Sequence, residues 1–175
     1  VVSTGTNSGV SAAGIVAGTG TSGGTFIGCS NLGNVTATSG EAAGIAIRAY
    51  KAANCINNGS ITSDGGIGSY AAGIAVYGWN AEQCVNTGSV TGKTAAAGIL
   101  VGSDGTVENC YNTGTITAVG KGFEYQGAYG ITASFRGKVK SCFTYNSNNH
   151  VGICPIDVDS SQNKVVNSYY LASSK

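Results

Sequence analysis

Two short motifs recur along this chain with a common period. The first is Cys-x-Asn-x-Gly, with both the asparagine and the glycine replaced in the last copy, and its cysteines are Cys29, Cys55, Cys84, Cys110 and Cys142. The second is Ala-Ala-Gly-Ile, or Ala-Tyr-Gly-Ile in the last copy, and its glycines are Gly14, Gly44, Gly73, Gly98 and Gly130. Neighbouring copies of either motif lie 25 to 32 residues apart. Such a period is typical of a solenoid, in which each repeat stacks on the one before it.

Each repeat contains three short runs of β-forming residues. In one copy these runs are Ala72–Tyr77, Ala81–Asn86 and Ser89–Thr91, and they are joined by Gly, Asn, Ser and Thr. No long segment has apolar residues at helical spacing, which argues against leucine-rich, ankyrin and tetratricopeptide repeats. We therefore predict an all-β fold, a parallel β-helix (β-solenoid) of about five to six coils with three short strands each, forming a single domain over residues 1–175.

Stacking turns every repeated residue into a row along the solenoid. Asparagine tolerates the left-handed backbone of a turn, and its amide can bond to the asparagine of the next coil. We expect one such structural row from the asparagines of the first motif, which are Asn31, Asn57, Asn86 and Asn112.

The cysteines that begin the first motif, Cys29 to Cys142, are expected to form a second structural row. Parallel stacking places Cβ atoms about 4.8 Å apart, which is longer than the roughly 3.8 Å of a disulfide, so free buried thiols are predicted. Cys154 lies outside the row, and a local disulfide between Cys142 and Cys154 stays open as an alternative. The chain has no Cys-x-x-Cys and a single histidine, His150, so no metal or other cofactor is predicted. His150 is given no role.

One question about this row is left open by the sequence. The residue after each cysteine is also apolar, although consecutive residues of a strand face opposite sides. These following residues are Ile56, Val85, Tyr111 and Phe143. The pattern alone does not say which of the two neighbours faces inward.

Composition excludes several classes of partner. Charged residues make up 10% of the 175 residues, the net charge is +1, and the nine Lys and Arg are scattered. This distribution offers no electrostatic footprint for nucleic acid, and no apolar run is long enough for membrane insertion. The chain begins with Val-Val-Ser-Thr-Gly-Thr, without Met or a signal peptide. We expect it to be a fragment of a longer multidomain protein, with neighbouring domains of the parent chain among its partners.

The repeats resemble a known family. Gly-Ile followed by Asn-Cys-Tyr-Asn-Thr-Gly-Thr-Ile, with a closing Asn-Ser-Tyr-Tyr-Leu-Ala, is similar to the GLUG-type repeats of bacterial cell-surface proteins, which occur in adhesins and IgA1-specific metallopeptidases. The resemblance extends from Gly14 to Ala172. It implies a right-handed β-helix in a secreted, extracellular protein at the cell surface, used for display or adhesion, with a glycan or a host surface protein as partner. The chain has no His-Glu-x-x-His, and no catalytic residue is carried over.

An enzyme acting on polysaccharides is the first alternative, since parallel β-helices of that kind use clustered carboxylates. The eight acids are Glu41, Asp64, Glu82, Asp104, Glu108, Glu124, Asp157 and Asp159. Only Asp157 and Asp159 are close in sequence, where they suit a capping turn better than a calcium site. The basic residues Arg136, Lys138 and Lys140 alternate along one run and are interpreted as a solubilising face. We therefore predict that the chain is not an enzyme, with a lyase or hydrolase as the alternative.

An ice-binding solenoid is a further alternative. The third β run of four successive repeats has hydroxyl or amide residues on either side of an apolar residue, and low charge fits such a surface. These runs are Asn34–Thr36, Ser60–Thr62, Ser89–Thr91 and Thr115–Thr117. Ordinary outward-facing hydroxyls of a β surface explain them equally well.

A group of aromatic residues gives the more localised signal for binding. The sixth residue after the repeated glycine is Tyr50 in one coil and Trp79 in the next, and the fourth residue is Arg48 and Tyr77. In later coils the sixth position is Asp104 and then Arg136. If these positions face outward, the aromatic rings form a platform for sugar faces or a protein interface, with a guanidinium beside it. We therefore predict Arg48, Tyr50, Tyr77 and Trp79 as ligand-binding residues.

Overall fold

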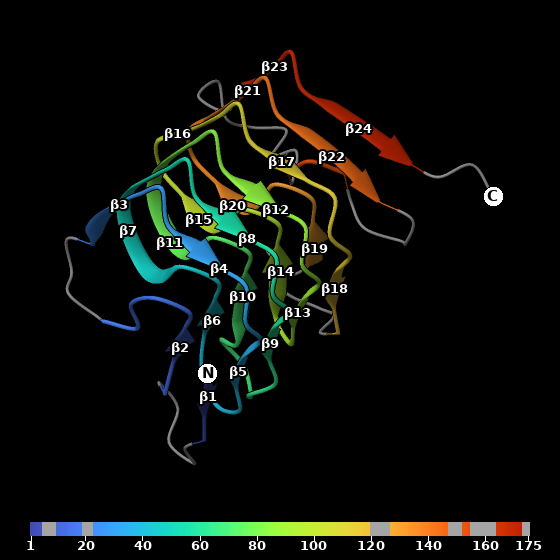
Figure 1. Cartoon of the computed structure of the whole chain (residues 1–175). Helices are drawn as coiled ribbons and strands as arrows, with labels where there is room; N and C mark the ends of the chain where they lie inside the picture. Colours follow the sequence, from blue (N-terminus) through green and yellow to red (C-terminus); the bar gives the residue numbers. More distant parts are fainter. Residues whose placement is uncertain (5–9, 19–22, 120–126, 147–151, 155–163, 173–175) are drawn as a thin grey trace.

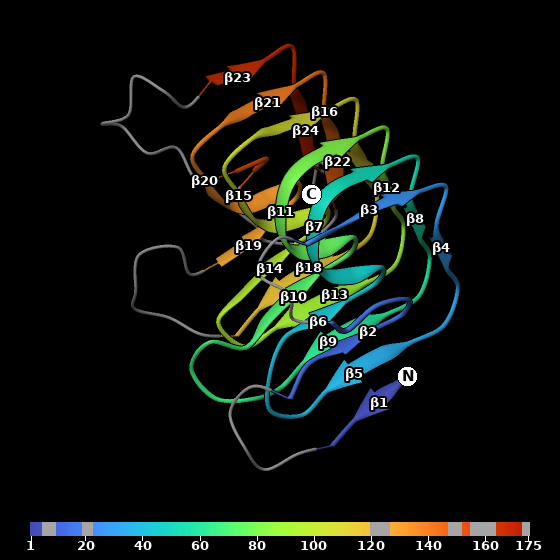
Figure 2. The same ribbon diagram turned by 90° about the vertical axis from the view of Figure 1, so that its left-hand side faces the viewer.

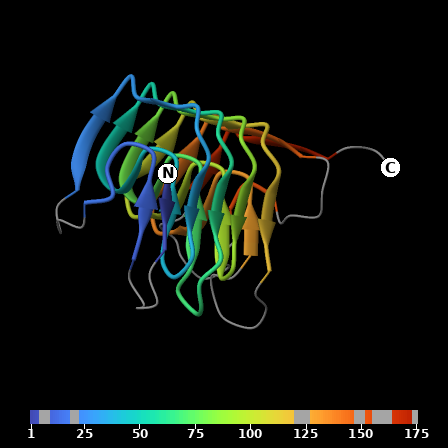
Figure 3. The same ribbon diagram turned by 60° about the horizontal axis from the view of Figure 1, so that its bottom comes forward.

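The computed structural model describes residues 1–4, 10–18, 23–119, 127–146, 152–154 and 164–172. In these residues the chain is a parallel β-solenoid of about five turns, which confirms the predicted fold class. The strands stack in chain order along the axis, from blue at one end to red at the other (Figure 1 and Figure 3). None of the described residues forms a helix, so no helix among them could span a membrane.

The coils build four sheets, which we call A to D. Sheet A contains β1 (Val2–Ser3), β5 (Val35–Ala37), β9 (Ile61–Ser63), β13 (Val90–Gly92) and β18 (Ile116–Ala118). Sheet B contains β2 (Ala12–Ala13), β6 (Ala42–Ala43), β10 (Tyr70–Ala72), β14 (Ala95–Ala97) and β19 (Gly127–Tyr129). Sheet C contains β3 (Gly24–Ile27), β7 (Ala46–Ala53), β11 (Ala75–Glu82), β15 (Leu100–Ser103), β16 (Thr106–Glu108), β20 (Thr132–Phe135), β21 (Lys138–Lys140) and β23 (Lys164–Val166). Sheet D contains β4 (Ser30–Asn31), β8 (Ile56–Asn57), β12 (Val85–Asn86), β17 (Tyr111–Asn112), β22 (Phe143–Asn146) and β24 (Tyr169–Ala172).

A complete coil therefore visits four sheets, and the prediction of three strands per coil was wrong. The predicted run Ala72–Tyr77 is divided at Gly73 and Ile74, where the chain turns from sheet B to sheet C. The run Ala81–Asn86 is divided at Gln83, whose backbone φ is 51°. Left-handed residues of this kind turn the chain sharply, so one apparent strand becomes two.

The same left-handed corner decides which residue of the cysteine pair faces inward. A residue with φ between 48° and 53° precedes the motif position in each of five coils, and these residues are Asn54, Gln83, Asn109, Ser141 and Asn167. After the corner the strand alternates normally, so that Cys55 is buried, Ile56 is exposed and Asn57 is buried. The cysteine faces inward, and its apolar neighbour faces solvent.

The interior holds two apolar cores with a column of asparagines between them. One core lies between sheets A and B and includes Val35, Ile61, Val90 and Ile116 together with alanines of sheet B. The other combines sheet C with the cysteine row and includes Ile45, Ile74, Leu100 and Val107. Between these cores each asparagine amide donates to the next asparagine, with Nδ2 to Oδ1 distances of 2.7 Å at each of three steps from Asn31 to Asn112. Asn112 donates to Thr144, which occupies the place of the asparagine in the next coil.

A third apolar cluster lies outside the solenoid lumen, where sheets B and C meet. Adjacent residues of sheet B divide between the two sides, since Ala42 packs in the inner core and Ala43 in the outer cluster. From sheet C the cluster receives Ile47, Val76 and Val101, all buried. The outer faces of sheets B and C thus pack against each other in a concave corner (Figure 2, where sheet C lies above sheet B). This corner positions the groove described next.

Candidate functional site

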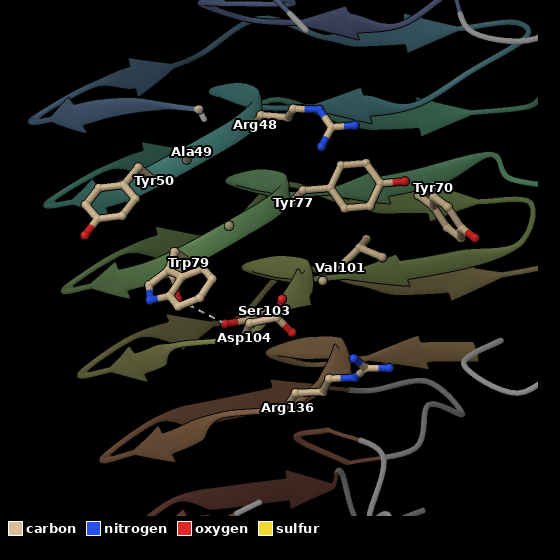
Figure 4. A pocket seen from close by; sticks show the side chains of 13 residues that line it. Arg48, Ala49, Tyr50, Tyr70, Tyr77, Trp79, Val101, Ser103, Asp104 and Arg136 are labelled. Carbon is tan, nitrogen blue, oxygen red and sulfur yellow. Dashed lines mark hydrogen bonds between the residues drawn. The ribbon is translucent and has the colours of Figure 1, made fainter. Parts of the chain in front are cut away.

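A groove of about 550 Å³ lies on the concave side of the solenoid, beside the outer apolar cluster. Strands of sheet C and the residues next to them supply most of its wall, and Tyr70 of sheet B supplies the remainder. The side chains that define it are Arg48, Tyr50, Tyr70, Tyr77, Trp79, Asp104 and Arg136. Figure 4 shows Tyr50 and Trp79 on one side of the groove, with Arg48, Tyr77 and Tyr70 on the other and Asp104 and Arg136 further along the axis.

Strand register brings the four predicted binding residues into this one groove. Tyr77 pairs with Arg48, and the pairing of Gly78 with Ala49 and Asn80 with Lys51 places Trp79 beside Tyr50. Tyr50 and Trp79 are 57% and 51% exposed, so two aromatic rings from neighbouring coils face solvent together. Tyr77 and Arg48 are half-buried behind them.

Tyr77 contacts three other residues in and beside the groove. The Arg48 guanidinium lies over its ring, 4.8 Å from the centroid, and Tyr70 meets it edge to face with centroids 6.3 Å apart. The Tyr77 hydroxyl donates to Oε1 of Glu41 at 3.0 Å. Burial, followed by the negative charge of Glu41, raises the pKa of Tyr77 above its ordinary value, so the hydroxyl stays protonated and fixed as a donor.

Gly102 keeps the groove open beside Tyr77. It pairs with Tyr77, and a Cβ at this position would fall 3.4 Å from Cδ1 of the tyrosine ring. A larger side chain there would cover the ring, so the exposed surface of Tyr77 depends on this glycine of the adjacent coil. Gly78 borders the inner core instead, because a Cβ on it would fall 2.9 Å from both terminal methyl groups of Leu100.

Sequence reasoning missed part of this site. Tyr70 was not singled out, because it lies on a different sheet and joins the groove only through the concave corner. The signal that could have revealed the corner is the apolar residue three positions after each repeated glycine, since Ile47, Val76 and Val101 form the outer cluster. Arg136 was interpreted as part of a solubilising face with Lys138 and Lys140, but it lines the groove.

The acidic residues are more dispersed than the groove residues. Among the described acids, stacking places Glu82 and Glu108 in register on β11 and β16, a proximity that the sequence did not indicate. Each is paired with a lysine, Glu82 with Lys51 at 3.1 Å and Glu108 with Lys140 at 3.3 Å. Glu124, Asp157, Asp159 and His150 lie outside the described residues. Within the described ranges, no three Cys, His, Asp or Glu side chains are grouped so that they could hold a metal ion.

The cysteine row consists of free thiols in the described structure. Cys55, Cys84, Cys110 and Cys142 are buried and Cys29 is half-buried, and both Cys142 and Cys154 are free. Each of the four buried thiols of the row donates to the carbonyl two residues earlier, as Cys84 does to Glu82 at 3.3 Å. Hydrogen bonding to Cys142 and Cys84, together with burial, raises the pKa of Cys110. The row is therefore structural packing remote from the groove.

Sheet A presents the hydroxyl residues in a regular row. Thr36 pairs with Thr62, Thr62 with Thr91, and Thr91 with Thr117. The inward residues between the two outward positions are buried, as Ile61 and Val90 show. The neighbouring outward row contains Asn34, Ser60, Ser89 and Thr115, in which Ser89 donates to Ser60 at 3.0 Å.

Comparison with known proteins adds no relative. Neither a protein-family model, nor a curated protein, nor a solved structure matches this chain. Function is therefore inferred from the residues of the groove and from the rows of hydroxyl side chains on sheet A.

Proposed function

We propose that this chain is a non-enzymatic, extracellular module of a cell-surface protein, used for display or adhesion, and that it binds glycans in the groove. The observation that carries the proposal is the pair of half-exposed rings, Tyr50 and Trp79, held in register on adjacent coils. Aromatic faces stack on the apolar faces of sugar rings, and polar groups beside them fix orientation. The resemblance to GLUG-type repeats of bacterial surface proteins supports the location and the adhesive role.

The groove has the polar groups that such a ligand needs. Asp104 offers acceptors for sugar hydroxyls, and Arg48 and Arg136 offer donors. The rings project from paired strands of a stacked sheet, so the backbone that carries them is already ordered before binding. A glycan is favoured over a protein partner because the aromatic rings line a groove beside charged groups, whereas protein interfaces centre on an apolar core.

The test is a titration of candidate plant, mucin and cell-wall glycans, followed by the fluorescence of Trp79, the one tryptophan in the chain. We expect a saturable response that is weakened in Tyr50→Ala. Calorimetry, which does not depend on the fluorescent ring, should show that Trp79→Ala no longer binds, with unchanged circular dichroism. Tyr111→Ala is the matched control, since Tyr111 is an exposed aromatic residue on sheet D, outside the groove. Binding that survives the loss of both groove rings, or no response to any glycan, would leave a spacer or protein-binding stalk as the better interpretation.

The threonine row favours a second candidate function, binding to ice. Its hydroxyls repeat about every 4.8 Å along the axis, with the neighbouring outward row roughly 6.7 Å away along the strand. A rigid lattice of hydroxyl and methyl groups can order water at such a surface. The test is thermal hysteresis of the purified chain, which Thr62→Tyr should abolish and Thr113→Tyr, outside the row, should preserve. Absence of hysteresis in the unmodified chain excludes this candidate.

A further inference from the structure

Two arginines line the groove without an acidic partner. Three ion pairs occur among the described residues, and each uses a lysine: Lys51 with Glu82, Lys93 with Asp64 and Lys140 with Glu108. Neither Arg48 nor Arg136 takes part in an ion pair within the described part of the chain. The groove is therefore lined by two arginines without ion pairs and by one carboxylate, Asp104, which lies between them along the axis (Figure 4), so its lining residues carry one excess positive charge.

Arg48 is the more constrained of the two. Its Nε is buried and has no hydrogen-bond partner, and the guanidinium is held against the Tyr77 ring. Glu41, the carboxylate next to Tyr77, forms no ion pair with Arg48: one of its oxygens accepts from Tyr77 at 3.0 Å and the other from Ser11 at 2.8 Å. A partly desolvated cation with unused donors gains more from an incoming anion than a fully hydrated one does.

Arg136 repeats this charge further along the groove. The pairing of Arg48 with Tyr77, Tyr77 with Gly102, and Gly102 with Ser134 places Arg136 three coils beyond Arg48. Three coil spacings of about 4.8 Å correspond to roughly 14 Å along the axis. This separation is too large for one small anion to reach both guanidinium groups, but an extended ligand lying along the groove can contact both.

We infer that the groove takes an anionic oligosaccharide, whose carboxylate or sulfate groups bind Arg48 and Arg136 while its sugar rings stack on Tyr50 and Trp79. This inference rests on the proposed glycan-binding function and names its ligand class. Planar guanidinium groups bind carboxylate and sulfate oxygens with two parallel hydrogen bonds, which explains why arginine rather than lysine occupies both positions. Asp104 can accept hydrogen bonds from sugar hydroxyls between the two arginines.

The experiment measures affinity by calorimetry for two matched pairs of hexasaccharides. The first pair is hexagalacturonate and its fully methyl-esterified form, and the second is sulfated maltohexaose and maltohexaose. We expect the acidic member of at least one pair to bind about tenfold or more tightly than its neutral partner, with affinity falling as salt rises. The pair that shows the difference identifies the acidic group as carboxylate or sulfate.

Variants assign the effect to the arginines. Arg48→Gln and Arg136→Gln should each weaken the acidic ligand about tenfold more than they weaken its neutral partner, whereas Arg48→Lys should lose less. Lys93→Gln removes one positive charge outside the groove and should change nothing. Circular dichroism and thermal melting confirm that each variant is folded.

The outcomes separate this inference from the function it builds on. Equal binding of acidic and neutral sugars, lost in Trp79→Ala, would overturn the acidic ligand and keep the glycan site. No binding of any saccharide would overturn both. Polyglutamate binding as tightly as the acidic sugars, without dependence on Trp79, would overturn the inference in favour of an acidic protein segment.

Discussion

Asn86 lies against Gly73 across the interior of the solenoid, so closely that a methyl group on the glycine would fall 2.5 Å from the asparagine Oδ1. The same contact joins Gly44 to Asn57 and Gly98 to Asn112. In each of these coils one glycine and one asparagine are therefore in close contact between the two apolar cores. The two motifs share a period because they form the two sides of this contact.

Gly73→Ala should destabilise the fold by about 2–3 kcal/mol, because the added methyl group meets the Asn86 amide and the backbone carbonyl of Gly98. Urea unfolding of the purified variant measures the loss. Gly66→Ala is the matched control, since nothing lies within 4 Å of a Cβ at that position. Equal stabilities for the two variants would contradict the close contact.

Asn86→Ala should cost about 2–4 kcal/mol, because it removes three hydrogen bonds from a buried column. These bonds are the one that Asn86 accepts from Asn57 and the ones that it donates to Gly88 and Asn112. Asn58→Ala, one position beyond the column and exposed, should cost less than about 1 kcal/mol. A loss of similar size at both positions, measured by urea unfolding, would mean that the column adds no stability of its own.

The cysteine row should react slowly with a thiol reagent in the native protein and rapidly after denaturation. Half-buried Cys29 should label first, and the buried members of the row only on unfolding. Mass spectrometry of the labelled peptides reads out the order. Rapid labelling of Cys84 without denaturant would be incompatible with an inward-facing row.

Cys84→Ser should destabilise the protein by about 1–2 kcal/mol, since the hydroxyl is more costly to bury than the thiol. The loss is limited because Ser168, at the corresponding place in the last coil, donates to the Val166 carbonyl at 3.0 Å, as the cysteines do to theirs. Cys84→Ala, which leaves a small cavity and no hydroxyl, is the companion variant for thermal melting. A serine variant as stable as the unmodified chain would show that the row does not select for sulfur.

Stability should fall as the pH rises above 10, in part because of Tyr77. Burial and then Glu41 raise its pKa above the ordinary value of 10, so the folded chain keeps a proton that the unfolded chain releases. The contribution of Tyr77 to the free energy of unfolding is therefore complete below pH 10, and it is lost as the pH approaches the higher pKa of the folded state. Denaturation at increasing pH should show a shallower decline in Tyr77→Phe, while Tyr50→Phe, at an exposed position, keeps the original slope.

The fold class could be predicted from the sequence because the repeat period shows which residues of successive coils stack on one another. Once Cys55 and Cys84 are placed one above the other, Tyr50 and Trp79, each five residues earlier, must be adjacent. The fourth sheet did not follow, because the residue type at the corner with positive φ varies between coils, as Asn54, Gln83 and Ser141 show. The corner between sheets B and C was equally hidden, since it depends on which face of an all-alanine strand packs outward.

The unpaired arginines show the same limit. Sequence counting places Arg48 beside Tyr77, but whether Arg48 forms an ion pair depends on Glu41, which lies just before β6 and accepts hydrogen bonds from Tyr77 and Ser11. Such local competition among donors and acceptors is decided by side-chain geometry in three dimensions. The repeat period therefore predicts which residues lie together in the site, whereas their ion pairs and hydrogen bonds follow only from the three-dimensional structure.

The directional asparagine column makes coils interchangeable building units. One coil spans the 29 residues between Asn57 and Asn86, and each amide needs only another amide above and below it. A gene that gains or loses such a unit would still encode an uninterrupted rod, so length can drift during evolution. The groove does not share this freedom, since loss of the coil containing Trp79 would set Tyr50 beside Asp104. Rod length and ligand recognition are thus inherited under different constraints: the first tolerates duplication, and the second records the order in which particular coils were joined.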